Sequence, residues 1–190
     1  RPISFSDFHM RFNRPIFRVL LALPLMGICL SAEAAVFYSK DEAFELAFGK
    51  DAEIVEHPVY LSDEDSAEIE KRSQIKPESQ LITFFEGHQK GSLVGYAVID
   101  SHTVRTQTET VLVVLSPKGE LIRTELLAFH EPPEYKPGEG WLKHLEKRNI
   151  PDLRLNHGVD GIAGATLSSR AILNSIRKTL ATFQVAVQKP

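Results

Sequence analysis

The sequence predicts an α+β domain in which an antiparallel β-sheet packs against a few helices, and two observations carry this prediction. From residue 80 to residue 129 apolar and polar residues alternate in strand-length segments, and short turns separate these segments. The rest of the chain has helical spacing and ends in an amphipathic helix. The apolar face of such a helix must be covered, and the sheet is the surface available to cover it.

Four segments have the length and the alternation of strands. Two connections between them are short and rich in turn-forming residues: 87–91 contains two glycines, and 116–119 has the order Ser-Pro-Lys-Gly. Because short connections join antiparallel neighbours, we expect consecutive segments to pair as hairpins. The predicted strands are 81–86, 92–100, 109–116 and 120–129.

Two helices are predicted ahead of the sheet. Ser39 and Glu42 have the spacing of a capping box, and aromatic and aliphatic residues follow them up to Gly49. Residues 62–76 are dense in charged side chains, and Pro77 ends this run. We expect the first helix to contribute to the core and the second to be largely solvated. An acidic docking face for a partner is the alternative for the second helix.

Two further helices are predicted behind the sheet. After Gly140, the residues Trp141, Leu142 and Leu145 have helical spacing, which indicates a short helix. The C-terminal helix has one apolar face and carries its basic side chains elsewhere, so we expect it to pack on the sheet. The apolar face consists of Ile172, Ile176, Leu180, Phe183 and Val187.

The N-terminal segment, residues 1–34, has the features of a Sec-type secretory signal peptide. Met10 is the natural start of translation, basic residues follow it, and residues 19–30 form an apolar stretch that is short for a membrane-spanning helix. The segment ends in Ala-Glu-Ala, the small-residue pattern of a cleavage site. We therefore expect a periplasmic or otherwise extracytoplasmic protein that begins at Ala35. An uncleaved membrane anchor is the alternative.

Residues 35–190 have the length of a single domain, and their composition excludes several classes of function. Cys29 is the only cysteine and precedes this part, which excludes disulfides, thiol catalysis and cysteine-bound metal or haem. The part contains 18 basic against 23 acidic residues, so nucleic acid is not an expected partner. Its six histidines are not at metal-ligand spacing, and it has no nucleophile elbow. We predict no metal site and no catalytic side chain.

Residues 160–170, Asp-Gly-Ile-Ala-Gly-Ala-Thr-Leu-Ser-Ser-Arg, run directly into the C-terminal helix. They place the hydroxyl of Thr166 at the start of this helix, behind Gly164. The free N–H groups of a first helical turn and the positive end of the helix dipole both favour an anion. The motif therefore predicts a site for a phosphate group. An ordinary helix cap is the alternative.

This motif resembles the flavinylation motif of the FMN-binding domain family, which includes covalently flavinylated components of the sodium-translocating NADH:quinone reductase and of the Rnf complex. In that family a flavin transferase uses FAD to attach FMN to a threonine hydroxyl through a phosphodiester. The resemblance implies covalent FMN on Thr166 and a flavin transferase as the maturation partner. The sequence departs from the motif at Ala163, where many members have Ser or Thr. The resemblance also places Asp160, Gly164, Ala165, Leu167 and Ser168 at the cofactor.

The segment after the last predicted strand offers a second side for the flavin. Glu131 and Glu134 could reach the ring edge or the ribityl hydroxyls, and Tyr135 supplies an aromatic surface beside two stiff prolines. In the family an equivalent loop lies against the flavin. The loop 102–106 aligns with another cofactor-facing loop and offers Arg105 to the phosphate or to a partner's carboxylate. A rigid surface turn and a plain surface arginine are the alternatives.

Together these features predict an exported electron-transfer flavoprotein rather than a stand-alone enzyme, because the cofactor would supply any chemistry. Its expected partners are the flavin transferase and redox donor and acceptor proteins, for example a membrane reductase or a cytochrome. One alternative is an extracytoplasmic flavin-dependent reductase of a small acceptor. The other is a flavin-free binding or assembly protein of the same fold.

Overall fold

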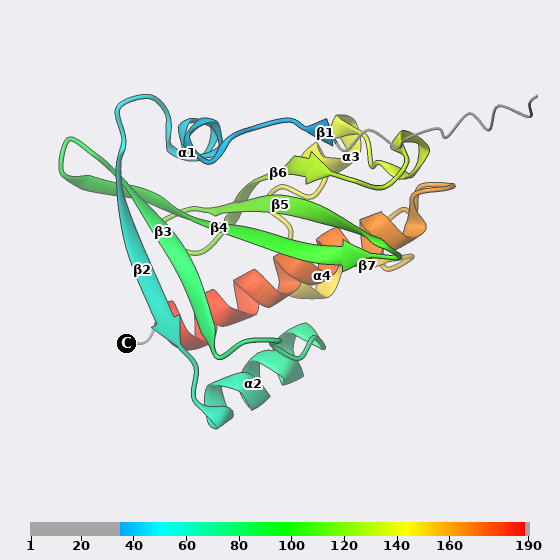
Figure 1. Ribbon diagram of the computed structural model, residues 1–190. Helices are drawn as coiled ribbons and strands as arrows, with labels where there is room; N and C mark the ends of the chain where they lie inside the picture. Colours follow the sequence, from blue (N-terminus) through cyan, green and yellow to red (C-terminus); the bar gives the residue numbers. More distant parts are fainter. Residues whose placement is uncertain (1–34, 189–190) are drawn as a thin grey trace, which may run out of the picture. The chain divides into compact units, whose positions relative to one another are not determined.

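The computed structural model of the chain describes residues 35–188 (Figure 1). The predicted signal peptide, residues 1–34, lies outside the described residues. Within the described residues, no helix combines the length and the apolar character that a membrane crossing requires.

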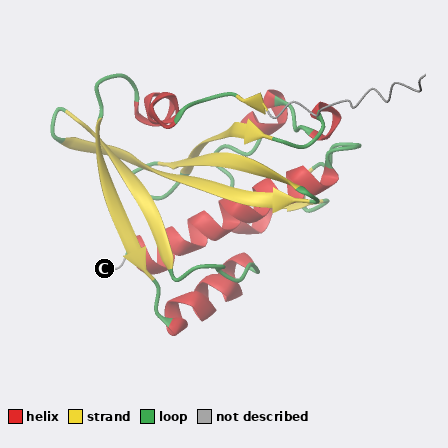
Figure 2. Ribbon diagram, in the orientation of Figure 1, coloured by secondary structure: helices red, strands yellow, loops and turns green. Residues whose placement is uncertain are grey.

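The described residues contain a six-stranded sheet in which every neighbouring pair is antiparallel (Figures 1 and 2). The strand order across the sheet is β1-β6-β5-β4-β3-β2, so consecutive strands from β2 to β6 are neighbours. The hairpin arrangement and the α+β fold class that the sequence predicts are confirmed. The strands are β1 (Ala35–Val36), β2 (Glu53–Tyr60), β3 (Leu81–Gln89), β4 (Ser92–Val104), β5 (Gln107–Leu115) and β6 (Leu121–Phe129).

The sequence prediction of the sheet missed β1 and β2, and it ended β3 and β4 too early. It missed β2 because Pro58 and exposed acidic residues interrupt the alternation in this segment. A proline is tolerated in a strand at the edge of a sheet, and β2 is an edge strand. Strand β4 continues through His102 to Val104, and the turn to β5 consists only of Arg105 and Thr106.

The described helices agree with the predicted ones. Both N-terminal helices begin with a capping box, formed by Ser39 with Glu42 and by Ser62 with Asp65. Between the sheet and the last helix lie short turns and a two-stranded parallel pair that the sequence did not reveal. The elements are α1 (Lys40–Phe48), α2 (Asp63–Ser73), η1 (Pro133–Tyr135), α3 (Glu139–Lys143), η2 (Ile150–Asp152), β7 (Arg154–Leu155), β8 (Gly158–Val159), α4 (Thr166–Thr182) and the π-helical turn η3 (Phe183–Val187).

Helices cover both faces of the sheet, and β5 shows this most clearly. Val111 and Val113 pack in the cluster that contains α4, whereas Leu112 and Val114 pack in the cluster that contains α1. Since successive side chains of a strand point to opposite faces, α4 and α1 cover opposite faces. Because helices cover both faces of the sheet at β5, this strand is buried along most of its length.

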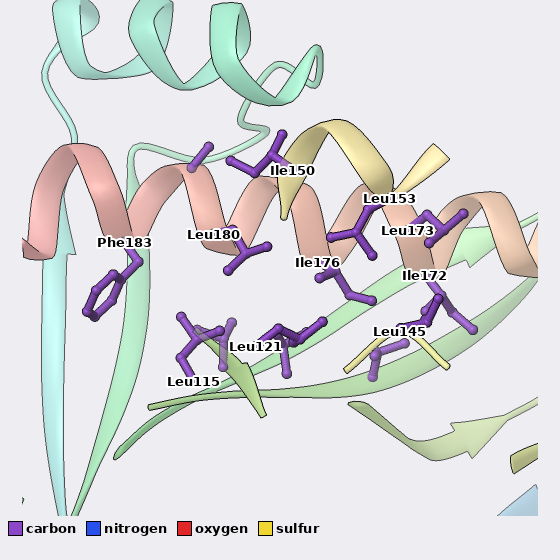
Figure 3. Packing of buried hydrophobic residues seen from close by; sticks show 14 of the residues in the cluster. Leu115, Leu121, Leu145, Ile150, Leu153, Ile172, Leu173, Ile176, Leu180 and Phe183 are labelled. Atoms are coloured by element: carbon purple, nitrogen blue, oxygen red, sulfur yellow. The ribbon is translucent and has the colours of Figure 1, made fainter. Parts of the chain in front are cut away.

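The predicted apolar face of α4 lies in the core. Figure 3 shows four of its residues along the helix, with Leu115 and Leu121 facing them from the sheet side. Burying one large aliphatic or aromatic side chain contributes about 1.5–3 kcal/mol, so this face fixes α4 on the sheet. The buried residues of the predicted face are Ile172, Ile176, Leu180 and Phe183, and Val187 is only partly buried.

Candidate functional site

The structure brings most of the predicted cofactor residues to one place. A pocket of about 280 Å³ lies where the start of α4 meets the β4–β5 turn and η1. A larger pocket of about 430 Å³ lies between β3, β4 and α4, and none of the predicted residues lines it. The residues that line the smaller pocket are Arg105, Glu131, Tyr135, Gly164, Thr166, Leu167 and Ser168, all of which belong to the predicted set.

Thr166 is the first residue of α4, and its side chain is exposed. Its hydroxyl makes only a long hydrogen bond, of 3.4 Å from Oγ1 to the carbonyl oxygen of Ile162. The preceding residue, Ala165, has no side chain that can cap the helix, and the first turn contains no acidic residue. The first-turn N–H groups and the positive end of the helix dipole therefore remain available to an anion beside the Thr166 hydroxyl.

Gly164 determines how the chain enters α4. Its φ of +87° lies in the left-handed region, which glycine adopts at no steric cost. A Cβ atom at this position would lie 3.6 Å from the carbonyl oxygen of Glu134, so the loop before α4 and η1 run close together here. The two segments that the sequence predicts on opposite sides of the cofactor are thus neighbours in space.

Arg105 and Tyr135 contact each other at the pocket. The guanidinium carbon of Arg105 lies 5.0 Å from the centroid of the Tyr135 ring, which is cation–π geometry. Arg105 occupies the two-residue turn between β4 and β5, with a φ of +52°. The turn therefore presents a cation to the pocket, and the aromatic ring helps to hold it there.

Glu131 is buried, and it holds this turn in place. Its Oε1 accepts hydrogen bonds from the backbone N–H groups of Thr106 at 3.0 Å and Gln107 at 3.1 Å. The sequence suggested that Glu131 reaches the flavin directly. In the structure one of its two carboxylate oxygens is engaged by the β4–β5 turn, so its clearest role is to position Arg105.

Three residues of the predicted set do not line the pocket. Asp160 is exposed, and its backbone carbonyl accepts a hydrogen bond from Trp141 Nε1 at 2.9 Å. Ala165 is buried at the start of α4, and Glu134 is an exposed residue of η1. Asp160 and Ala165 support the backbone that leads into α4.

Sequence reasoning missed a buried charge network beside the β4–β5 turn. His102 lies between two carboxylates, with Nε2 at 2.8 Å from Glu109 Oε1 and Nδ1 at 3.4 Å from Asp100 Oδ2. Asp100 Oδ1 also accepts a hydrogen bond from Lys178 Nζ of α4 at 3.2 Å. Part of this network could be read from the sequence, because Asp100 and His102 are two residues apart in a strand and therefore lie on the same face. The partner Glu109 follows only from the pairing register of β4 with β5.

The network shifts the pKa values of its members. Burial opposes the charging of His102, but the hydrogen bonds that its ring donates to Asp100 and Glu109 outweigh burial and raise the pKa of His102 to about 9. Burial also acts against the charged form of Asp100, yet His102 and Lys178 hold the pKa of this carboxyl well below its ordinary value. For Glu109 burial dominates and raises the pKa. His102 is thus a partly buried cation at neutral pH.

The part of the chain that the structure describes contains no group of three or more His, Cys, Asp or Glu side chains that could hold a metal ion. What the pocket offers is a hydroxyl, an uncapped helix start, a guanidinium and an aromatic ring. These groups suit a ligand that carries a phosphate and an aromatic ring system.

The family model of the FMN-binding domain matches residues 106–181. This range contains β5, β6 and nearly all of α4, and nine of the ten predicted cofactor residues lie in it. Arg105, the tenth, directly precedes it. No curated protein and no solved structure matches the chain.

Proposed function

Because residues 106–181 belong to the FMN-binding domain family, we propose that the protein is an exported electron-transfer flavoprotein that carries FMN on Thr166 through a phosphodiester. The observation that carries the covalent part of the proposal is the position of the Thr166 hydroxyl. It is exposed at the uncapped start of α4, in a pocket lined by Arg105 and Tyr135.

The residues of the pocket fit the phosphate of FMN. The first turn of α4 has neither a side-chain cap nor an acidic residue, so its N–H groups and its dipole favour the anion. The guanidinium of Arg105 adds a full positive charge. The one carboxylate of the lining, Glu131, accepts two backbone N–H groups through Oε1, which lowers its repulsion of a bound phosphate.

When bound, FMN supplies the one- and two-electron chemistry of the protein. The chain's own groups bind and orient it: the Thr166 Oγ1 forms the ester, Arg105 and the start of α4 hold the phosphate, and Tyr135 offers its ring. Leu167, 48% exposed beside Thr166, adds apolar surface at the mouth of the pocket.

Export and partners complete the proposal. We propose that residues 1–34 are removed as a signal peptide and that the protein works outside the cytoplasm. A flavin transferase would load it from FAD, with AMP as the leaving group, and a membrane reductase or a cytochrome would exchange electrons with it. A covalent bond prevents loss of the cofactor by dilution outside the cytoplasm. Retention of residues 19–30 in protein purified from its host would argue for a membrane-anchored form instead.

The experiment that tests the function is a two-step assay on protein from its native host. First, the visible spectrum of denatured and desalted protein should retain flavin absorbance, because a covalent cofactor survives unfolding. A native protein without flavin absorbance would support the flavin-free alternative, whereas flavin that is lost only on denaturation would show that the cofactor is not covalent. Second, a chemical reductant should reduce the protein, and oxidation should then depend on an added redox protein. Rapid catalytic turnover of a small acceptor would favour the reductase.

A further inference from the structure

Two arginines lie where β7 packs against α4, near enough for the charge of one to act on the other, and neither lines the flavin pocket. Arg177 belongs to α4, and Arg154 belongs to β7, directly after Leu153, which Figure 3 shows beside α4. The C-terminal end of α2 also borders this site, because its capping residue Gln74 accepts a hydrogen bond from Arg154. Arg177 follows Thr166 by eleven residues, which places it about 16 Å further along the helix axis.

The hydrogen-bond partners of both arginines are neutral amides. Nη2 of Arg177 donates to Asn174 Oδ1 at 2.6 Å, and Nη1 of Arg154 donates to Gln74 Oε1 at 2.7 Å. Among the described residues, neither arginine lies within 4.0 Å of a carboxylate, whereas Arg72 and Lys178 each pair with one. The positive charge of this site is therefore not compensated by the part of the chain that the structure describes.

This arrangement is costly without a counter-charge. Arg177 is only 8% exposed, and a buried charge is ordinarily paired with an opposite one. Burial and the neighbouring charge of Arg154 both lower the pKa of Arg177. The two cations thus repel each other in a place where water screens them little.

The unused donors indicate where a ligand would bind. Nε of Arg154 and Nε of Arg177 are both buried and lack a hydrogen-bond partner among the described residues. Nη2 of Arg154 and Nη1 of Arg177 have no partner there either, but they are not among the buried atoms. Both guanidiniums therefore keep donors, and one donor of each reaches the surface.

We propose that Arg154 and Arg177 together bind an oxyanion, a phosphate, sulfate or carboxylate group, at the junction of α2, β7 and α4. Each guanidinium presents a planar set of N–H donors, from which an oxyanion can accept two hydrogen bonds at once. The anion would neutralise the two cations and tie three separate elements of the chain together. This site is separate from the flavin pocket, and it does not depend on the function proposed above.

The test is the thermal unfolding midpoint of the purified protein in phosphate, sulfate or acetate, each against sodium chloride at equal ionic strength. An anion at ten times its dissociation constant should raise Tm by about 3 °C or more. Arg177→Met and Arg154→Gln should abolish this rise. Because each substitution also removes one of two repelling cations, both variants should be at least as stable as the wild type in chloride.

Two control variants separate this site from other cationic surfaces. Arg170→Gln removes an exposed arginine of α4, and Arg105→Gln removes the cation of the flavin pocket. Arg170→Gln should keep the full response, and Arg105→Gln should keep the part of the response that the site of Arg154 and Arg177 provides. A response to acetate alone would identify a carboxylate as the natural ligand, and a response to phosphate or sulfate would identify a tetrahedral anion. The proposal is overturned if no oxyanion stabilises the protein beyond chloride, if Arg177→Met still responds, or if Arg105→Gln abolishes the response.

Discussion

The start of α4 differs from the starts of α1 and α2 in how it treats its free N–H groups. Ser39 and Ser62 cap α1 and α2 through complete capping boxes, and each of these helices has acidic residues in its first turn. At α4 the capping position is Ala165, and the first turn contains no acid. The chain thus stabilises two helix starts with its own side chains and leaves the third, which begins with Thr166, without such a partner.

This difference supports the proposal that a ligand binds at the first turn of α4. Its stability comes from the apolar face buried on the sheet, so the helix tolerates the missing cap. The β4–β5 turn, which presents Arg105, lies across the pocket from the helix start. It is held by Glu131 and lies beside the network around His102.

The largest effect is expected from the buried network, which stabilises the hairpin opposite α4. The pKa of His102 is about 9 in the folded protein and 6.5 for an ordinary histidine. Protonated His102 therefore contributes stability in full below pH 6.5, and this contribution is lost as pH rises through 9. It amounts to something on the order of 3 kcal/mol. Urea unfolding at several pH values should show this loss for the wild type. His102→Gln should lack it, whereas His157→Gln, at an exposed site, should retain it.

The next effect is expected at Gly164, which directs the chain into the uncapped helix. An alanine with a φ of +87° is strained, so Gly164→Ala should destabilise the protein by about 1–2 kcal/mol and reduce flavin loading. Gly161 is the matched control in the same loop, because its φ is not in the left-handed region and no atom lies near a Cβ there. Gly161→Ala should be neutral or slightly stabilising. Equal effects of the two substitutions on urea unfolding would contradict this account of the loop.

The caps of the other two helices should affect stability only. Ser39→Ala and Ser62→Ala each remove a side-chain acceptor from a helix start, and we expect a loss of about 1 kcal/mol for each. Flavin loading should be unchanged, because neither helix start lines the pocket. A loss of loading in stable Ser39→Ala protein would show that the difference between the helix starts has no functional meaning.

The smallest effect is expected when the start of α4 is made to resemble the starts of α1 and α2. Leu167→Glu places an acidic residue in the first turn of α4, as in α1 and α2. Relative to Leu167→Gln, it should stabilise the flavin-free protein by about 0.3–1 kcal/mol through the helix dipole. The same charge should repel the phosphate, so the glutamate variant should load less flavin than the glutamine variant. Better loading of the glutamate variant would contradict an anion site at this turn.

The features that the sequence predicted are those that depend on neighbouring residues. The capping box of Ser39, the apolar face of α4 and the place of Thr166 at a helix start all follow from spacings of a few residues. The common pocket of Thr166, Tyr135 and Arg105 was predicted only because a family resemblance linked three separate segments.

The features that escaped prediction depend on contacts between distant segments. Glu109 meets His102 through the register of β4 and β5, and the pair of Arg154 and Arg177 forms where α4 meets β7. The hydrogen bonds that Glu131 accepts from the β4–β5 turn also escaped prediction, because the two backbone N–H groups lie 24 and 25 residues away in the sequence. Residue types and local spacing carry little information on such partners.

The most direct test of the central claim is the intact mass of denatured protein after incubation with a flavin transferase, Mg²⁺ and FAD. Wild-type protein should gain the mass of one FMN less one water. Thr166→Val keeps the β-branched shape but has no oxygen to form the ester, so it should fold and gain nothing, whereas Thr166→Ser should load at least in part. Gain of the same mass by the valine variant would show that the acceptor is another residue and would contradict the account.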